Sequence, residues 1–154
     1  MASRNIDDLT PTLREKWLRV RQKATERGIT IIETCTARDL KEQTALYAQG
    51  RNELPLVNEL RKIAGLPLID GLTNSRKVTW TMKSKHVVKL DKGEKSKAVD
   101  FAVVVRGKVS WDIKVNCNDN DIPDYYEVGQ IAKDEGLVWG GDWSSPDFPH
   151  VEEV

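Results

Sequence analysis

The only two histidines in the 154-residue chain, His86 and His150, both lie in polar motifs. Asp100 follows His86 by fourteen residues and opens an apolar run, where a lone charge would need a partner. Two imidazoles and a carboxylate are a familiar ligand set for catalytic zinc, which leaves a fourth position open for water. These residue types predict a Zn²⁺ site made by His86, Asp100 and His150.

A further carboxylate, Asp147, stands three residues before His150. A carboxylate beside a zinc-bound water can take the water's proton and then protonate a leaving amine. The run Ser145-Pro146-Asp147 is also a common turn composition, which explains the same residue without chemistry. Glu152 is an alternative base, but it shares a face with His150 only if that segment is extended.

The elements that must position these residues follow from hydrophobic periodicity and turn residues. Apolar residues at helical spacing follow Thr10 and Pro11, a typical N-cap and first helical residue. Short β-branched runs predict strands, and Arg106-Gly107 predicts a hairpin turn. The predicted helices cover 11–27, 39–49, 52–64 and 123–135, and the predicted strands cover 29–34, 78–82, 99–105, 108–113, 137–139 and 149–152.

This order of elements favours an α+β fold. We expect a small antiparallel sheet with N-terminal helices and one late helix, and the zinc site at the face of the sheet. The length suits a single catalytic domain covering residues 1–154.

Composition excludes several classes of protein. Hydrophobic residues make up 39% and charged residues 31% of a chain with zero net charge, so no bulk attraction to nucleic acid or to an anionic membrane is expected. Residues 1–97 nevertheless carry 20 basic and 12 acidic side chains, while residues 98–154 carry 4 and 12. Cys35 and Cys117 are too few for a disulfide framework, and the apolar surroundings of Cys35 predict a buried thiol.

Ser84-Lys85-His86, the later Ala98-Val99-Asp100 before a strand and the closing Asp147-Phe148-Pro149-His150 resemble a known family. It is the group of zinc peptidases that includes D-Ala-D-Ala carboxypeptidases, vancomycin-resistance D,D-dipeptidases and phage L-alanyl-D-glutamate endopeptidases. The resemblance implies that His86, Asp100 and His150 bind zinc and that Asp147 is the catalytic base.

The resemblance extends upstream to Arg38 and Gln43, which match an Arg-x(4)-Gln pattern, and to the run Tyr47-Ala48-Gln49-Gly50-Arg51. It implies that Arg38 approaches the substrate and steadies the oxyanion, as a permanent, directional donor can. Arg38 alone could equally be a salt-bridge residue at a helix start. By the same resemblance Ser84 hydrogen-bonds substrate or a ligand. Trp143 in Gly140-Gly141-Asp142-Trp143 either lines the cleft or packs within the fold.

One departure concerns the spacing of the ligands. The family usually places the aspartate seven residues after the first histidine, whereas here the two are fourteen apart. We interpret the difference as a longer loop, which costs little entropy and leaves Asp91 as a rival ligand. The loop carries Lys89, Lys92, Lys95 and Lys97, either as a solvated surface or as a guide for an acidic polymer.

The sequence therefore predicts a zinc-dependent peptidoglycan endopeptidase that cleaves the stem peptide between L-Ala and D-Glu, as a phage endolysin. The N-terminus lacks the apolar core of a signal peptide, and no segment reaches transmembrane length. We expect a monomer in the host cytoplasm that reaches the periplasmic wall after a separate holin-like protein permeabilises the membrane. The alternatives are a D,D-carboxypeptidase or dipeptidase that releases D-Ala, and an inactive zinc-containing protein that binds the cell wall.

A weaker pattern lies near the last helix. Its members fall on calcium-loop spacing, but the loop lacks Asp at its first position and Gly at its sixth. Helix capping before Pro123 explains the same residues. They are Asn116, Asn118, Asn120, Asp124 and Glu127.

Overall fold

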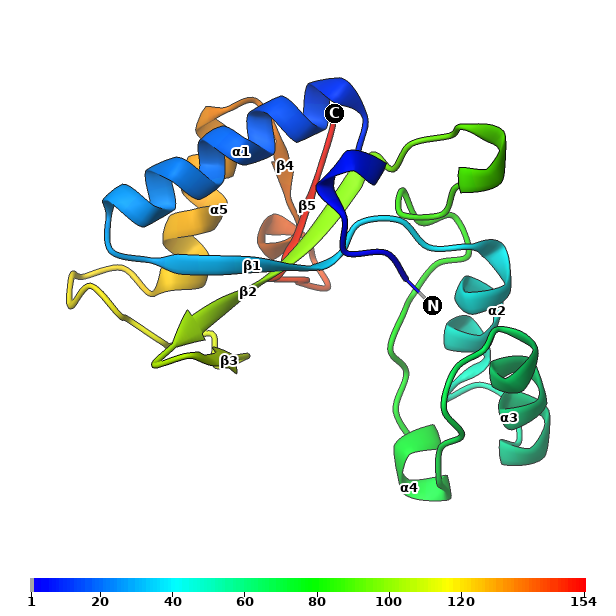
Figure 1. Cartoon of the computed structure of the whole chain (residues 1–154). Helices are drawn as coiled ribbons and strands as arrows, with labels where there is room; N and C mark the ends of the chain where they lie inside the picture. The colour runs from blue at the N-terminus through cyan, green and yellow to red at the C-terminus, as the bar shows by residue number, and fades with distance from the viewer. Residues whose placement is uncertain (1) are drawn as a thin grey trace.

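A five-stranded antiparallel sheet carries the site in the computed structural model, which describes residues 2–154. Its path runs β1-β2-β5-β4, and β3 pairs with β2 (Figure 1). The α+β class, the antiparallel sheet and the late helix are all confirmed. The strands are β1 (Thr30–Cys35), β2 (Ala98–Val105), β3 (Lys108–Ser110), β4 (Val138–Trp139) and β5 (His150–Glu152).

Strand β2 separates the core from the site by simple alternation. Val99, Phe101 and Val103 are fully buried in the hydrophobic core, so the residues between them face the other side of the sheet. Asp100 therefore points away from the core. It pairs with Cys35 on β1 and with His150 on β5, which places residues from three strands next to one another.

Two helices, α1 (Pro11–Glu26) and α5 (Asp124–Asp134), cover the core face of the sheet. The Thr10 side chain caps α1, and Leu13, Trp17, Val20 and Ala24 recur on its buried face, as predicted. Trp17 also donates to Glu33 of β1 at 3.0 Å, which ties this helix to the edge of the sheet.

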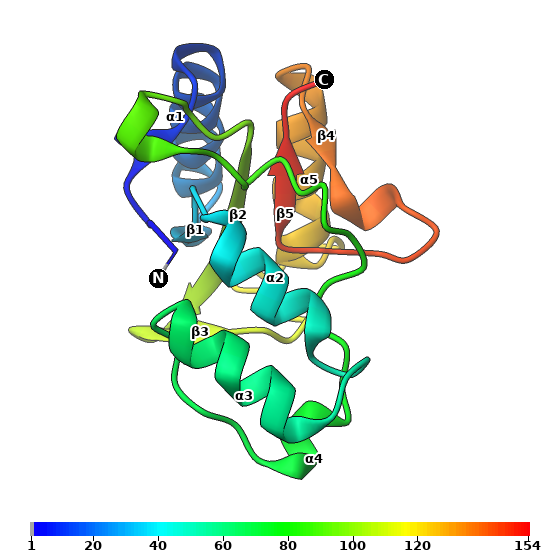
Figure 2. The same ribbon diagram turned by 90° about the vertical axis from the view of Figure 1, so that its right-hand side faces the viewer.

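Three further helices lie to one side of the sheet, away from α1 and α5, as the two views show (Figures 1 and 2). They are α2 (Leu40–Ala48), α3 (Leu54–Ile63) and the single turn α4 (Gly71–Asn74). Three short 3-10 turns lie elsewhere in the chain, at Ile6–Asp8, Leu90–Lys92 and Gly140–Asp142. Asp39 caps α2 by accepting from the Glu42 amide, and Pro55 lies in the first turn of α3, as expected. No helix within residues 2–154 is long and apolar enough to cross a membrane.

One predicted strand was wrong, and another was predicted too long although its hairpin pairing with β2 is confirmed. Residues 78–82 form no strand, because side chains of α2 and its flank take their backbone oxygens: Gln43 donates to Thr81 O at 2.6 Å and Arg51 to Thr79 O at 3.0 Å. The strand expected at 108–113 ends at Ser110, where the Tyr125 hydroxyl donates to the carbonyl at 2.6 Å. A β-branched run predicts a strand only when a neighbouring strand is there to pair with it.

Replacing the buried ring of Phe101 tests this core. Phe101 lies 5.7 Å from Trp17 and 5.4 Å from Tyr125 between ring centroids, so Phe101→Ala leaves a cavity that neither neighbour can fill. We expect a loss of about 3–5 kcal/mol in the free energy of unfolding, measured by urea titration. Trp111→Ala is the control, because Trp111 is exposed and its loss should change stability by less than about 0.5 kcal/mol. Equal losses would contradict the assigned core.

Candidate active site

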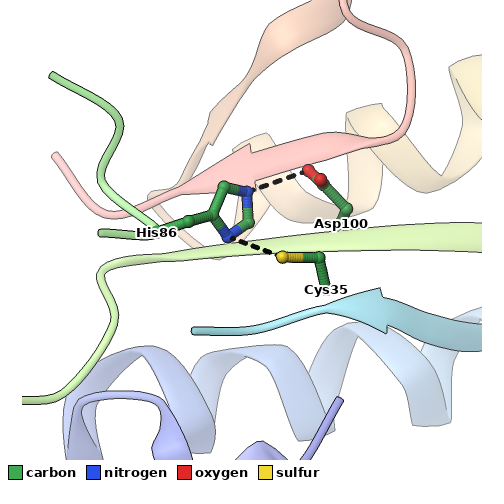
Figure 3. A group of neighbouring side chains, drawn as sticks. All are labelled: Cys35, His86 and Asp100. Carbon is green, nitrogen blue, oxygen red and sulfur yellow. Dashed lines mark hydrogen bonds and ion pairs between the residues drawn. The ribbon is translucent and has the colours of Figure 1, made fainter. Parts of the chain in front are cut away.

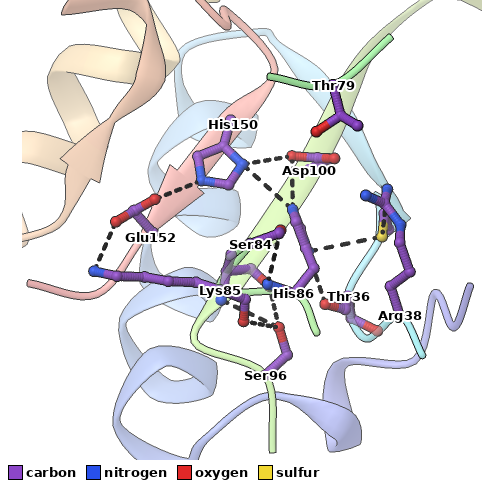
Figure 4. Close-up of polar contacts among 12 residues, drawn as sticks. Thr36, Arg38, Thr79, Ser84, Lys85, His86, Ser96, Asp100, His150 and Glu152 are labelled. Carbon is purple, nitrogen blue, oxygen red and sulfur yellow. Dashed lines mark hydrogen bonds and ion pairs between the residues drawn. The ribbon is translucent and has the colours of Figure 1, made fainter. Parts of the chain in front are cut away.

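Three side chains aim a donor atom at one point on the open face of the sheet. Asp100 Oδ1 lies 3.1 Å from His86 Nε2 and 3.0 Å from His150 Nδ1, and the two nitrogens are 3.3 Å apart. Asp100 and His150 come from adjacent strands, while His86 comes from an irregular segment (Figure 4). The structure thus brings together the three residues that the sequence singled out as ligands.

His86 is held in place by the chain after β1. Its amide donates to the Ser84 hydroxyl at 3.2 Å, its carbonyl accepts from the Arg38 amide at 2.8 Å, and Thr36 O lies 2.8 Å from its Nδ1. Because a carbonyl can only accept, Nδ1 carries the ring proton and Nε2 presents its lone pair to Asp100. Cys35 Sγ lies 3.7 Å from the same Nδ1, on the side of the ring away from Asp100 (Figure 3).

The other imidazole is oriented by Glu152. Strand β5 is extended, so Glu152 shares a face with His150, and its Oε1 lies 2.8 Å from His150 Nε2. The second Glu152 oxygen pairs with Lys85 Nζ at 2.7 Å. A proton on Nε2 is thereby fixed, and Nδ1 is left as a lone pair toward Asp100 (Figure 4). Glu152 therefore orients an imidazole and is not placed as the base.

This donor set fits a tetrahedral metal ion. With both rings in these tautomers, three electron-pair donors face one another at 3.0–3.3 Å, which is repulsive unless a proton or a cation lies between them. Ligand atoms around a tetrahedral zinc with bonds near 2.0–2.1 Å are separated by about 3.3 Å. The rival set that includes the Cys35 thiol is less suitable, because Cys35 and Asp100 face different nitrogens of His86.

The electrostatics of the cluster point the same way. Burial by itself lowers the pKa of His86, but hydrogen bonds with Asp100 and Cys35 raise this pKa to about 10. Burial likewise opposes protonation of His150, and Asp100 and Glu152 still raise its pKa. Burial would raise the pKa of Asp100, yet the two rings hold it well below its usual range. The negative charge of Asp100 is therefore stabilised by positive charge between the three side chains, which a divalent cation would supply.

Asp147 lies beside the three candidate metal ligands without a hydrogen bond to any of them. One of its oxygens is within 4.8 Å of ligand atoms of Asp100 and His150. Desolvation raises the pKa of Asp147, and the charge of Asp100 adds to this, against the attraction of His150 and His86. The result is a carboxylate that is more basic than usual and adjacent to the candidate metal.

The loop that carries Asp147 depends on Gly140. The Gly140 carbonyl accepts from the Asp147 amide at 2.9 Å, and a Cβ built on Gly140 would come within 2.5 Å of Asp147 O and 3.1 Å of the His150 Cβ. The Trp139 indole also donates to Phe148 O at 2.8 Å. Only glycine lets the loop fold back this closely, which gives the Gly140-Gly141 motif a packing role.

Arg38 lines the same cavity, and Gln43 fixes its direction. One guanidinium nitrogen donates to Gln43 Oε1 at 2.9 Å and another contacts Cys35 Sγ at 3.5 Å. The fully buried Gln43 amide in turn donates to Thr81 O at 2.6 Å, on the segment that forms another wall of the cavity. The Arg-x(4)-Gln pattern therefore joins a cationic donor to the residue that orients it.

The cavity has a volume of about 570 Å³ and is lined by Arg38, Asp147 and all three candidate ligands. Trp143 lines it too, with its ring centroid 5.1 Å from that of His150. Ser84 lines it as well, but its hydroxyl accepts from the His86 amide at 3.2 Å, so it also shapes the turn before His86.

The long segment between His86 and Asp100 does not supply the ligand. Asp91 lies in an exposed 3-10 turn and lines a smaller, separate pocket. Lys95 extends to Asp7 O at 2.9 Å, because the loop folds onto the N-terminal segment. Within residues 2–154, the cavity wall contains Lys83 and Lys85 but none of the four loop lysines, so their role as a guide for substrate stays a prediction.

Sequence reasoning missed three features of the site. Gln43 was part of the Arg-x(4)-Gln pattern, but its role in orienting Arg38 was not predicted. The pairing of Lys85 with Glu152 was not predicted either. Trp80, 67% exposed on the cavity wall, lies in the segment that was predicted to be a strand. Glu152 was identified from the sequence as a residue on the face of His150, since alternation along an extended segment puts it there, but as an alternative base and not as the group that orients the ring.

A sheet face that carries two histidines, an aspartate, a nearby carboxylate and an arginine defines a metallopeptidase type of site. The family model described as D-alanyl-D-alanine carboxypeptidase matches residues 77–153, half of the chain. This match contains all three candidate ligands and Asp147. The chain belongs to the D-alanyl-D-alanine carboxypeptidase family, and it is a peptidase.

Two known proteins are similar to this chain, one in sequence and one in fold. The chain is 29% identical over 154 residues to the peptidoglycan L-alanyl-D-glutamate endopeptidase CwlK of Bacillus subtilis, with 96% of this chain and 74% of the relative covered. Its fold is similar to that of the L-Ala D-Glu endopeptidase ChiX of Serratia marcescens, with a TM-score of 0.53 and 18% identity. That comparison covers 100% of this chain and 89% of the other.

Removing the carboxylate that orients His150 should weaken metal binding. Glu152→Gln can no longer fix the proton on Nε2 through a charged acceptor, so we expect zinc affinity to fall by roughly 10- to 100-fold. The measurement is competition with a zinc chelator. Glu153→Gln is the matched control, because Glu153 contacts Thr10 instead. Unchanged affinity in Glu152→Gln would contradict the orienting role.

Proposed function

We propose that this chain is a zinc-dependent peptidoglycan endopeptidase that cleaves the stem peptide between L-Ala and D-Glu. The observation that carries the proposal is the convergence of His86 Nε2, His150 Nδ1 and Asp100 Oδ1, with Asp147 and Arg38 in the same cavity. The choice of the L-Ala–D-Glu bond follows the names of the two similar proteins, both of which are L-alanyl-D-glutamate endopeptidases.

The chemistry divides between the metal and the chain's own residues. Zinc held by the three ligands would act as a Lewis acid and lower the pKa of a bound water. Asp147, with its raised pKa, is placed to accept a proton from the attacking water and to pass it to the leaving amine nitrogen. Arg38, held by Gln43, is placed to donate to the oxygen that becomes negative when water adds to the carbonyl.

The cavity wall suits an anionic peptide. Arg38, Lys83 and Lys85 place basic side chains around the ligands, and the exposed rings of Trp80 and Trp143 offer flat apolar surface. A stem peptide carries free carboxylates that such side chains can bind. Lys85 is already paired with Glu152, which leaves Arg38 and Lys83 as the candidates for this contact.

Digestion of purified sacculi by the zinc-loaded protein separates the proposal from its alternatives. Masses that reveal a new N-terminal D-Glu support endopeptidase activity. Released D-Ala would instead identify a D,D-carboxypeptidase or dipeptidase, and the absence of any product would favour an inactive zinc protein that binds the wall.

The biological setting is a further part of the proposal. We propose that the enzyme is a phage endolysin, which accumulates in the host cytoplasm and reaches the periplasmic wall once a holin-like protein opens the membrane. The support is the resemblance of residues 47–51 and 140–143 to phage-type enzymes. Expression in a Gram-negative host should lyse cells only when the membrane is permeabilised, and lysis without permeabilisation would contradict this route.

Asp147→Asn tests the assigned base. An amide cannot accept the water's proton, so we expect turnover on sacculi to fall by about 10²–10⁴ while zinc content and unfolding temperature stay the same. Asp142→Asn is the control on the same loop, because Asp142 is half-exposed and pairs with Lys133 at 3.0 Å. A near-normal rate for Asp147→Asn would exclude this residue as the base.

A further inference from the structure

The segment before α5 holds a second group of oxygen donors that plays no part in the peptidase mechanism. It does not line the catalytic cavity, and it joins β3 to the first turn of α5. Its side chains recur at positions 1, 3, 5, 9 and 12 of a twelve-residue run, which is the ligand spacing of a calcium-binding loop, and Ile122 stands at position 7, where the backbone carbonyl binds. The side chains are Asn116, Asn118, Asn120, Asp124 and Glu127.

Asp124 is the residue that indicates a missing partner. It is fully buried, and its Oδ2 accepts from the Cys117 amide at 2.8 Å, so the side chain faces the loop. Its Oδ1 is also buried and has no hydrogen-bond partner among residues 2–154. The Oδ1 of Asn118 is likewise buried and without a hydrogen-bond partner among these residues. A buried carboxylate oxygen without a partner is unfavourable, and a cation bound to Asp124 Oδ1 would remove the penalty.

Glu127 brings a second buried carboxylate to the same loop. Its Oε1 accepts from the side-chain amides of Asn118 at 3.1 Å and Asn120 at 2.5 Å, and Oε2 contacts Arg27 at 3.4 Å. Two amide donors and a guanidinium therefore stabilise the negative charge of Glu127, which a bound cation could stabilise instead. Turning the Asn120 carboxamide over would replace its donor beside Glu127 with an oxygen ligand, while Asn118 keeps its Nδ2 on Arg27 O and its Oδ1 without a hydrogen-bond partner.

We propose that residues 116–127 bind one Ca²⁺, with Asp124 and Glu127 as the charged ligands. Mg²⁺ is less suitable, because it demands a near-ideal octahedron of short bonds that a loop of mixed amide and carboxylate ligands does not offer. The loop is no exact EF-hand, since Asp119 at its fourth position adopts the left-handed conformation (φ 54°) and Asp121 replaces the sixth-position glycine. With only two charged ligands, we expect a dissociation constant on the order of 10⁻⁴–10⁻³ M.

Calcium at this site would tie together the two helices of the core face. Asn118 Nδ2 also lies 2.8 Å from Arg27 O, at the end of α1, while Asp124 and Glu127 belong to the first turn of α5. Occupancy should therefore stabilise the fold without altering the zinc ligands, which lie on the opposite face of the sheet.

The test is a titration of the zinc-loaded full chain with CaCl₂, followed by calorimetry and by thermal unfolding. We expect one Ca²⁺ per chain, a Tm that rises with calcium concentration, and a much smaller rise with MgCl₂. Glu127→Gln and Asp124→Asn should each weaken binding at least tenfold. Asp119→Asn removes the same charge from the same loop at a position that supplies no ligand, so it should bind calcium normally.

Several results would overturn the site. If the wild-type protein showed neither binding heat nor a Tm shift up to 10 mM CaCl₂, the calcium site would be excluded, whether or not the variants fold. An equal loss in Asp119→Asn would show only general attraction to acidic residues, and an equal response to Mg²⁺ would exclude a calcium loop. Zinc content, measured in parallel, keeps this outcome separate from any failure of the peptidase proposal.

Discussion

The carboxylate of Asp100 lies on the central strand of the sheet, and two imidazole nitrogens approach one of its oxygens to within 3.1 Å. Such a negative charge is stable there only if positive charge lies against it. The site is built around this requirement. Strand β2 turns Asp100 away from the core, β5 presents His150 beside it, and the chain after β1 holds His86 over both.

The surrounding residues act mainly by fixing direction. Thr36 and Glu152 each take the outward proton of one imidazole, so both rings present a lone pair to the same point. Gln43 does the same for Arg38, and Gly140 allows the loop of Asp147 to close against β5. Catalysis by such a site depends on groups that are oriented before substrate arrives, because reorientation during the reaction would cost free energy.

Much of this site could be predicted from residue types and short spacings. His86, Asp100, His150, Asp147 and Arg38 are all found in one cavity, because each belongs to a local motif that survives a change in loop length. The α+β order was also predictable, since helical and strand periodicities are clear in β2, α1 and α5.

Other features depended on contacts that no local pattern reveals. Residues 78–82 have the composition of a strand, but side chains from α2 and its flank bind their backbone instead. The fourteen-residue separation of His86 and Asp100 left Asp91 open as a ligand until the fold placed that loop against the N-terminal segment. The role of Gln43 likewise required the positions of two segments that are far apart in sequence.

The most direct test of the account is anomalous diffraction at the zinc edge from crystals of the zinc-loaded protein. The account predicts one peak per chain, about 2.0–2.2 Å from His86 Nε2, His150 Nδ1 and Asp100 Oδ1, with the fourth position open to solvent. A peak bound by Cys35, or by the outward nitrogen of either ring, would contradict it. So would a protein that binds no zinc and still digests sacculi at its full rate.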